Sequence, residues 1–170
     1  MIELETLNKN LIEVKTKIYD RLSLNISNVN SELEGTEYDA CQFELNGMKM
    51  ISRSSKITPK KVGQFVTFWK RNQNGETEPY SANDLFDFYI INAKFGDRFG
   101  QFVFPKSELM NKGFITTDKK DGKRGFRVYP VWDKTLNKQA EKTQEWQLNY
   151  FYEIDKMTDL KKVNELYNKE

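Results

Sequence analysis

The chain has 170 residues, with 27 basic and 25 acidic side chains and a formal net charge of +2 at pH 7. It contains no histidine and a single cysteine, Cys41. Nucleophile pairs and zinc sites that need an imidazole are therefore excluded, as are intrachain disulfides. An apolar fraction of 38% is sufficient for the core of one domain covering residues 1–170.

The first residues alternate acids with Leu and Ile, unlike a secretion signal, and no run of 18 apolar residues exists. The lone cysteine gives no support for an oxidising compartment. We therefore expect a cytoplasmic protein that does not insert into a membrane. The oligomeric state stays open.

The first half of the chain has patterns typical of both helices and strands. Apolar residues at steps of three and four predict an amphipathic helix over residues 2–22, and residues 23–36 have the composition of a loop. The segments 38–45 and 48–54 flank Asn46-Gly47, which predicts a β-hairpin with a tight turn. Thr58-Pro59 is typical of a helix start, which predicts a helix over residues 59–71.

The second half continues with strands and ends with helices. The predicted strands are residues 86–95, 99–104 and 125–131. Helical spacing returns from Leu136 to Ile154 and again from Leu160 to Tyr167. Because strands and helices do not alternate regularly, the sequence predicts an α+β fold. We expect a central mixed or antiparallel sheet of five to six strands, packed with N- and C-terminal helices.

The charges are unevenly distributed along the chain. Residues 1–44 sum to minus five, whereas residues 45–75 contain seven basic residues and no acid. Residues 98–130 hold eight basic and three acidic residues. A basic segment without acids repels itself in the folded state, and a polyanion relieves that repulsion while releasing counterions. The alternative is a solvated face neutralised by acids that the fold brings near.

This pattern favours a non-catalytic nucleic-acid-binding protein that contacts the phosphate backbone of DNA or RNA through a basic groove. The candidate contacts are Arg53, Lys56, Lys60, Lys61, Lys123, Arg124 and Arg127, with Trp132 as a candidate for base stacking. The sequence leaves open the type of nucleic acid, its strand form and any base preference.

Four dense segments resemble the MepB family. They are RSSKITPKKVGQFVTFWKR at 53–71, GQFVFPK at 100–106, GKRGFRVYPVWD at 122–133 and QAEKTQEWQ at 139–147. The resemblance implies that the chain is a single MepB-like domain. It further implies that the protein is the type member of the family or a near relative of it. It also implies an accessory gene encoded beside a multidrug efflux pump and its repressor. An adaptor or small-ligand-binding protein of that efflux system is therefore an alternative function.

A weaker resemblance concerns the helix, hairpin and helix at the start of the chain. Their order is similar to the core of restriction-endonuclease-like nucleases, in which an acid and an acid-x-Lys triplet hold Mg²⁺. The resemblance implies Lys56 as the lysine and, as candidate acids, Glu37, Asp39 and Glu44, of which Asp39 and Glu44 are the catalytic candidates. Ser54 occupies the place of the second acid. This departure favours binding without cleavage. A Mg²⁺-dependent nuclease stays an alternative, and otherwise no cofactor is expected.

Overall fold

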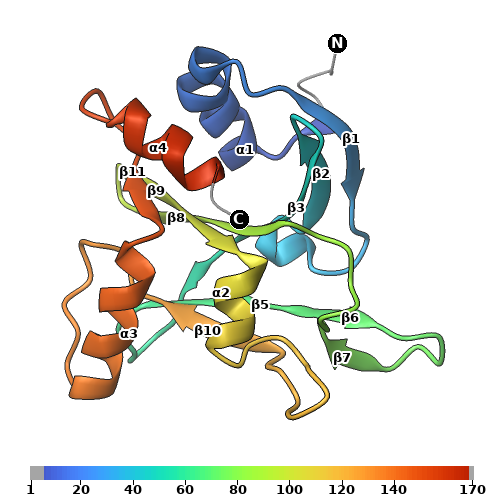
Figure 1. The fold of residues 1–170 in the computed structure, drawn as a ribbon. Helices are drawn as coiled ribbons and strands as arrows, with labels where there is room; N and C mark the ends of the chain where they lie inside the picture. Colours follow the sequence, from blue (N-terminus) through green and yellow to red (C-terminus); the bar gives the residue numbers. More distant parts are fainter. Residues whose placement is uncertain (1–5, 169–170) are drawn as a thin grey trace.

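A computed structural model describes residues 6–168, and its centre is a mixed six-stranded sheet of order β1-β2-β3-β8-β9-β11 (Figure 1). Its strands are β1 Ile26–Ser31, β2 Cys41–Leu45, β3 Met48–Ser54, β8 Phe88–Phe95, β9 Arg98–Pro105 and β11 Phe151–Glu153. The neighbours β3 and β8 are parallel, and the other pairs are antiparallel. The predicted α+β class and the mixed central sheet are confirmed.

Helices cover one face of this sheet, and helices with a second sheet cover the other (Figure 1). The first face carries α1 Lys9–Val14, continued by a π-helical and a 3₁₀ turn to Leu22, and α4 Leu160–Tyr167. The opposite face carries α2 Lys106–Asn111, α3 Lys138–Leu148 and a three-stranded sheet. That small sheet has the order β10-β5-β4 and consists of β4 Lys56–Ile57, β5 Gln64–Thr67 and β10 Gly125–Val128. No helix within residues 6–168 has the length and apolar character needed to cross a membrane.

The central strand β8 explains how one sheet supports two cores. Phe88 and Ile90 are buried in the cluster beneath α1 and α4, whereas Tyr89 and Ile91 are buried on the opposite face. Side chains alternate between faces along a strand, so a strand covered on both sides must be apolar throughout. The unbroken apolar run from Phe88 to Ile91 meets that requirement.

The predicted helix over residues 59–71 is wrong. The chain forms β5 and then β6 Trp69–Arg71, and β6 pairs with β7 Thr77–Pro79 in a hairpin. Val66 and Phe68 are fully buried, while the residues on either side of each are partly exposed, which is the period of a strand. Gly63 has a φ of +84°, outside the helical region, so it interrupts any helix that begins at Pro59.

Smaller differences concern the ends of predicted elements. The predicted loop at 23–36 contains β1, which adds an edge strand to the large sheet. The predicted helix after Leu136 ends at Leu148, and β11 then pairs with β9. The first helix begins at Lys9, and residues 2–5 of its predicted span lie outside the described residues.

Candidate nucleic-acid interface

The small sheet brings the two basic segments of the chain together. Lys56 on β4 lies opposite Phe65 on β5, and Phe65 lies opposite Arg127 on β10. Directly opposite residues of antiparallel strands share a face, and neighbouring strands are about 4.8 Å apart. The backbones of Lys56 and Arg127 are therefore about 10 Å apart across the sheet, although more than sixty residues separate them in the sequence.

Arg127 fastens the loop before β5 to β10. One guanidinium nitrogen donates hydrogen bonds to the carbonyls of Val62 and Gly63, both at 3.3 Å, and another donates to the Thr58 hydroxyl. All three partners are neutral, so the guanidinium keeps an uncompensated positive charge. The same contacts hold the loop that carries Lys60 and Lys61 next to this charge.

Two adjoining hollows, of about 410 Å³ and about 350 Å³, open beside Arg127 and are called here the basic groove. They share Arg127, Tyr129, Asn137 and Ala140 as lining residues. Five basic residues line the groove: Lys60, Lys61, Lys112, Lys123 and Arg127. No carboxylate is among the described residues that line it, so the groove is a concentrated positive site.

The walls of the groove are β10 and α3. Gln147 of α3 is fully buried and accepts a hydrogen bond from the Tyr129 amide at 2.9 Å. Its amide group donates to the Arg127 carbonyl at 3.0 Å. The Asn137 side chain caps α3 by accepting from the Ala140 amide, so the positive end of the helix dipole also lies at the groove.

Aromatic rings hold two of the lysines at the groove. The Lys112 ammonium lies 5.1 Å from the centre of the Trp146 ring, and the Lys123 ammonium lies 5.2 Å from that of Phe114. Such cation–π contacts orient a lysine without neutralising it. The Lys112 ammonium also lies 3.8 Å from a Glu108 carboxylate oxygen, so Lys112 has an acid beside it. Lys112 was not predicted from the sequence, although its position one residue before Gly113, at the end of the short α2 helix, could have indicated an exposed cation.

Two predicted phosphate contacts are already paired with acids. Arg53 is 4% exposed, and its guanidinium lies 2.8 Å from a Glu32 carboxylate oxygen. Burial favours the neutral form of Arg53, but the nearby Tyr89 and Glu32 outweigh it and raise the pKa of the guanidinium. Lys56 forms an ion pair with Glu37 at 3.1 Å. The fold therefore brings acids close to these two residues and neutralises them, as the alternative interpretation of the basic segments predicts.

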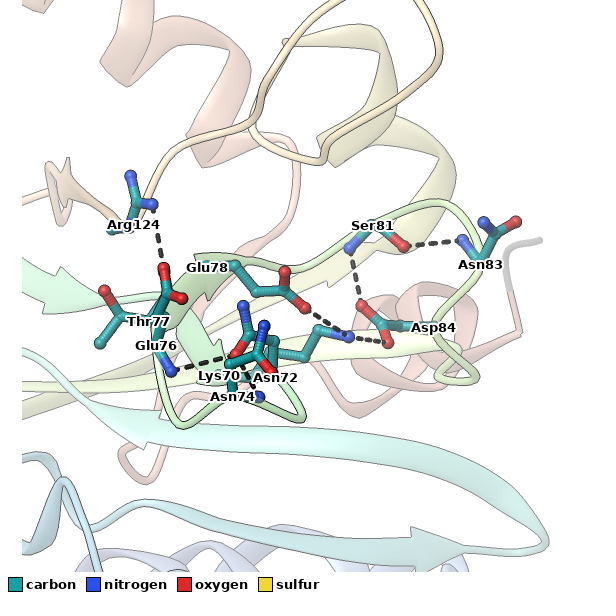
Figure 2. A network of polar contacts seen from close by, with 10 residues as sticks. All are labelled: Lys70, Asn72, Asn74, Glu76, Thr77, Glu78, Ser81, Asn83, Asp84 and Arg124. Atoms are coloured by element: carbon teal, nitrogen blue, oxygen red, sulfur yellow. Dashed lines mark hydrogen bonds and ion pairs between the residues drawn. The ribbon is translucent and has the colours of Figure 1, made fainter.

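The β6–β7 hairpin and the loop after it engage two further basic residues (Figure 2). Lys70 lies 2.7 Å from Asp84 and 3.3 Å from Glu78, and its hydrogen bond to Asp84 outweighs burial to raise the pKa of the ammonium. Arg124 donates to the Thr77 carbonyl at 3.1 Å, a neutral partner that leaves its charge uncompensated. Lys70 is therefore neutralised by acids, whereas Arg124 stays a candidate contact.

Trp132, the predicted stacking residue, is not among the residues that line the groove. Its ring lies 5.9 Å from that of Phe151, in an edge-to-face arrangement, and the Arg98 guanidinium lies 5.2 Å from its centre. Trp132 thus packs against the core edge, as large aromatic residues usually do. The aromatic residues that line the groove are Tyr129, Trp146, Phe114 and Phe126.

The residues implied by the nuclease resemblance do not gather around a cation. Asp39 precedes β2, whereas Glu44 lies near its far end, opposite Lys49, and accepts a hydrogen bond from Asn28. The Ser54 hydroxyl accepts a hydrogen bond from Asn10. Within residues 6–168, no three Asp, Glu or Cys side chains are grouped as metal ligands. These side chains therefore do not fit a Mg²⁺ site.

Comparison with known proteins places the chain in a family. A family model described as MepB-like matches residues 32–153, which is most of the chain. The chain belongs to the MepB-like family. The crystal structure of MepB is similar to it with a TM-score of 0.76 and 35% sequence identity, over 88% of this chain and 99% of that one. The match includes the segments that form the small sheet and both walls of the groove.

A second solved structure, a bacterial homing endonuclease named I-Ssp6803I, is similar with a TM-score of 0.41 and 17% identity. That alignment covers 88% of this chain and 87% of the endonuclease. No curated protein matches the sequence.

Proposed function

We propose that this MepB-like protein binds the phosphate backbone of DNA or RNA in the basic groove and does not cleave it. The observation that carries the proposal is the set of five cations around the basic groove, with no carboxylate among the described lining residues. Of these five, Lys112 is paired with an acid outside the lining, Glu108, at 3.8 Å. Phosphates in the groove would remove the repulsion among these cations and release condensed counterions.

The kind of cation indicates the kind of contact. Four of the five are lysines, which act as flexible point charges and bind phosphate without a fixed orientation. Backbone contacts of this kind position a nucleic acid but carry no sequence information. We therefore infer binding with little base preference. Binding without cleavage is supported by the separation of Asp39 from Glu44 and by the pairing of Lys56 with Glu37.

Fluorescence anisotropy with labelled DNA and RNA oligonucleotides, single- and double-stranded, at several salt concentrations tests the proposal. If the five cations each contact one phosphate, the log–log slope of affinity against salt on duplex DNA is about −4.5, and affinity falls about 500-fold between 50 and 200 mM. An affinity that does not change with salt would refute the proposal.

Matched double variants locate the site. Lys60→Ala with Lys61→Ala removes two groove cations whose side chains are exposed, and we expect the duplex slope to become shallower by about 1.8. The control is Lys161→Ala with Lys162→Ala, two exposed lysines on α4, which covers the opposite face of the large sheet (Figure 1). Equal losses in the two variants would show that binding depends on net charge and not on the groove.

A further inference from the structure

Residues 32–39, called here the acidic strap, connect β1 to β2 and contain four of the chain's acids. Three of its carboxylates each pair with a basic residue from the segment that has no acid of its own. The pairs are Glu32 with Arg53 at 2.8 Å, Glu34 with Arg71 at 2.7 Å and Glu37 with Lys56 at 3.1 Å. The strap thus places a row of negative charges along three strands, β3, β4 and β6.

Aromatic residues lie beneath and beside the strap. The Tyr38 ring lies 6.4 Å from that of Phe65 in an edge-to-face contact, and the Lys56 ammonium lies 5.1 Å from the centre of the Tyr38 ring. A hollow of about 550 Å³ lies between the strap and β6 and is lined by Trp69, with Arg71 stacked 5.5 Å from its ring. Aromatic rings interleaved with cations are typical of surfaces that bind single-stranded nucleic acid.

The covered surface continues into the basic groove. Phe65 lies directly opposite both Lys56 and Arg127 in the small sheet, so the three residues form one row across its outer face. Lys56 is under the strap, and Arg127 lines the groove. A chain of phosphates that leaves the groove along this row would next meet the cations that the strap occupies.

Much of the strap is weakly attached to the body. Leu33 is 96% exposed, and the ion pair of Glu34 with Arg71 is open to solvent on both sides. The hydrogen bond from Arg71 lowers the pKa of the Glu34 carboxyl, so this acid is charged at neutral pH. Exposed ion pairs contribute little and are screened by salt. The strap closes on itself through a hydrogen bond from the Glu32 amide to the Ala40 carbonyl at 3.0 Å.

We propose that the acidic strap covers an extension of the nucleic-acid interface, and that the phosphates of a single strand replace Glu34 and Glu37 on Arg71 and Lys56. This inference rests on the proposed function of the basic groove. The strap then limits the affinity of the free protein, because a bound strand must first displace carboxylates from these two cations.

The test is the double variant Glu34→Gln with Glu37→Gln, measured by anisotropy with a labelled single-stranded DNA. Glu32 is kept, because its loss would leave buried Arg53 without a counterion. With no carboxylate to displace from either cation, we expect affinity at 0.1 M salt to rise roughly tenfold, whereas the slope stays that of the unmodified protein because the same phosphates are contacted. The matched control is Glu145→Gln with Glu165→Gln, two exposed acids that form no ion pair within residues 6–168 and give the same change in net charge.

Equal affinities of the strap variant and the control variant for the single strand would overturn the inference alone, provided that the unmodified protein binds through Lys60 and Lys61. Failure of the unmodified protein and of both variants to bind would instead refute the proposed function. Amide hydrogen exchange gives an independent measurement. Exchange within residues 33–39 should become faster when the single strand binds, and slower exchange there would contradict displacement of the strap.

Discussion

Gln147 connects the two walls of the basic groove, and its replacement gives a sharp test of how the groove is built. The strand β10 is at the edge of the small sheet, so the Tyr129 amide and the Arg127 carbonyl depend on the Gln147 side chain for their hydrogen bonds. Gln147→Leu keeps a similar volume at a fully buried position but removes both partners. Each unsatisfied buried group costs about 1–3 kcal/mol, so the two groups together cost about 4 kcal/mol.

This loss should be visible in thermal and chemical unfolding. A chain of 170 residues has an unfolding entropy of about 0.36 kcal/mol/K, so a loss of about 4 kcal/mol lowers Tm by about 11 °C. Urea denaturation monitored by tryptophan fluorescence measures the change in free energy of unfolding directly. The folded variant should also bind nucleic acid more weakly, because α3 and β10 are no longer held in register.

The control is Gln139→Leu, an exposed glutamine on the same helix whose side chain forms no hydrogen bond within the described part of the chain. Its free energy of unfolding should stay within about 0.5 kcal/mol of that of the unmodified protein. A Gln147→Leu protein that is as stable as this control would show that α3 does not depend on the two hydrogen bonds.

Three further predictions follow from burial and backbone geometry. Gly63→Ala should lower the free energy of unfolding by about 2 kcal/mol in urea denaturation, because the φ of Gly63 is +84° and the new Cβ would lie 2.6 Å from the Tyr129 ring. Gly75→Ala, at a residue with a similar φ in open space, should cost less. Equal losses for the two variants would contradict this explanation. Burial raises the pKa of the Cys41 thiol to about 11, so iodoacetamide at pH 8 should alkylate the native protein about 100-fold more slowly than the urea-unfolded chain, and equal rates would refute it. Burial raises the pKa of Asp133, so its carboxylate is a destabilising charge in the folded state above that pKa. Asp133→Asn should therefore stabilise the protein at pH 7, and the gain in stability should disappear below the ordinary pKa of aspartate. No gain at pH 7 would exclude this account.

Local signals predicted the large sheet well. Asn46-Gly47 specifies a tight turn by itself, and the flanking strands pair as the hairpin β2–β3. The strand at 86–95 is apolar enough to be recognised without knowing its neighbours, because both of its faces are buried. Local patterns could not predict the parallel pairing of β3 with β8, because the sequence of a strand does not indicate which other strand pairs with it.

The segment from 59 to 71 shows where a periodicity argument fails. Val62, Phe65, Val66 and Trp69 fit a helical spacing, but Val66 and Phe68 fit the period of a strand equally well. The choice is made by pairing with β10, about sixty residues later, and by Gly63, whose positive φ ends any helix. Long-range pairing overrides local propensity here, as is usual for short strands.

The sequence predicted only part of the candidate site, because the ion pairs within it also depend on long-range contacts. Lys60, Lys61, Lys123 and Arg127 converge on one groove, as the distribution of charge suggested. Charge counts along the sequence could not predict which basic residues pair with acids. The carboxylates that pair with Arg53 and Lys56 come from the strap, which precedes β2 in the chain, whereas Arg53 and Lys56 follow it.

The number of cations that contact a phosphate, and not the number of basic residues, sets the salt dependence of binding at this surface. The seven candidates from the sequence would give a slope of about −6.3 on duplex DNA, whereas the five cations of the groove give about −4.5. Release of Lys56 and Arg71 from the strap would return the value to about −6.3 without any new residue. On duplex DNA, the slope of the unmodified protein therefore separates a strap that stays closed in the complex from a displaced one, and the Glu34→Gln and Glu37→Gln variant should change that slope only if the strap stays closed.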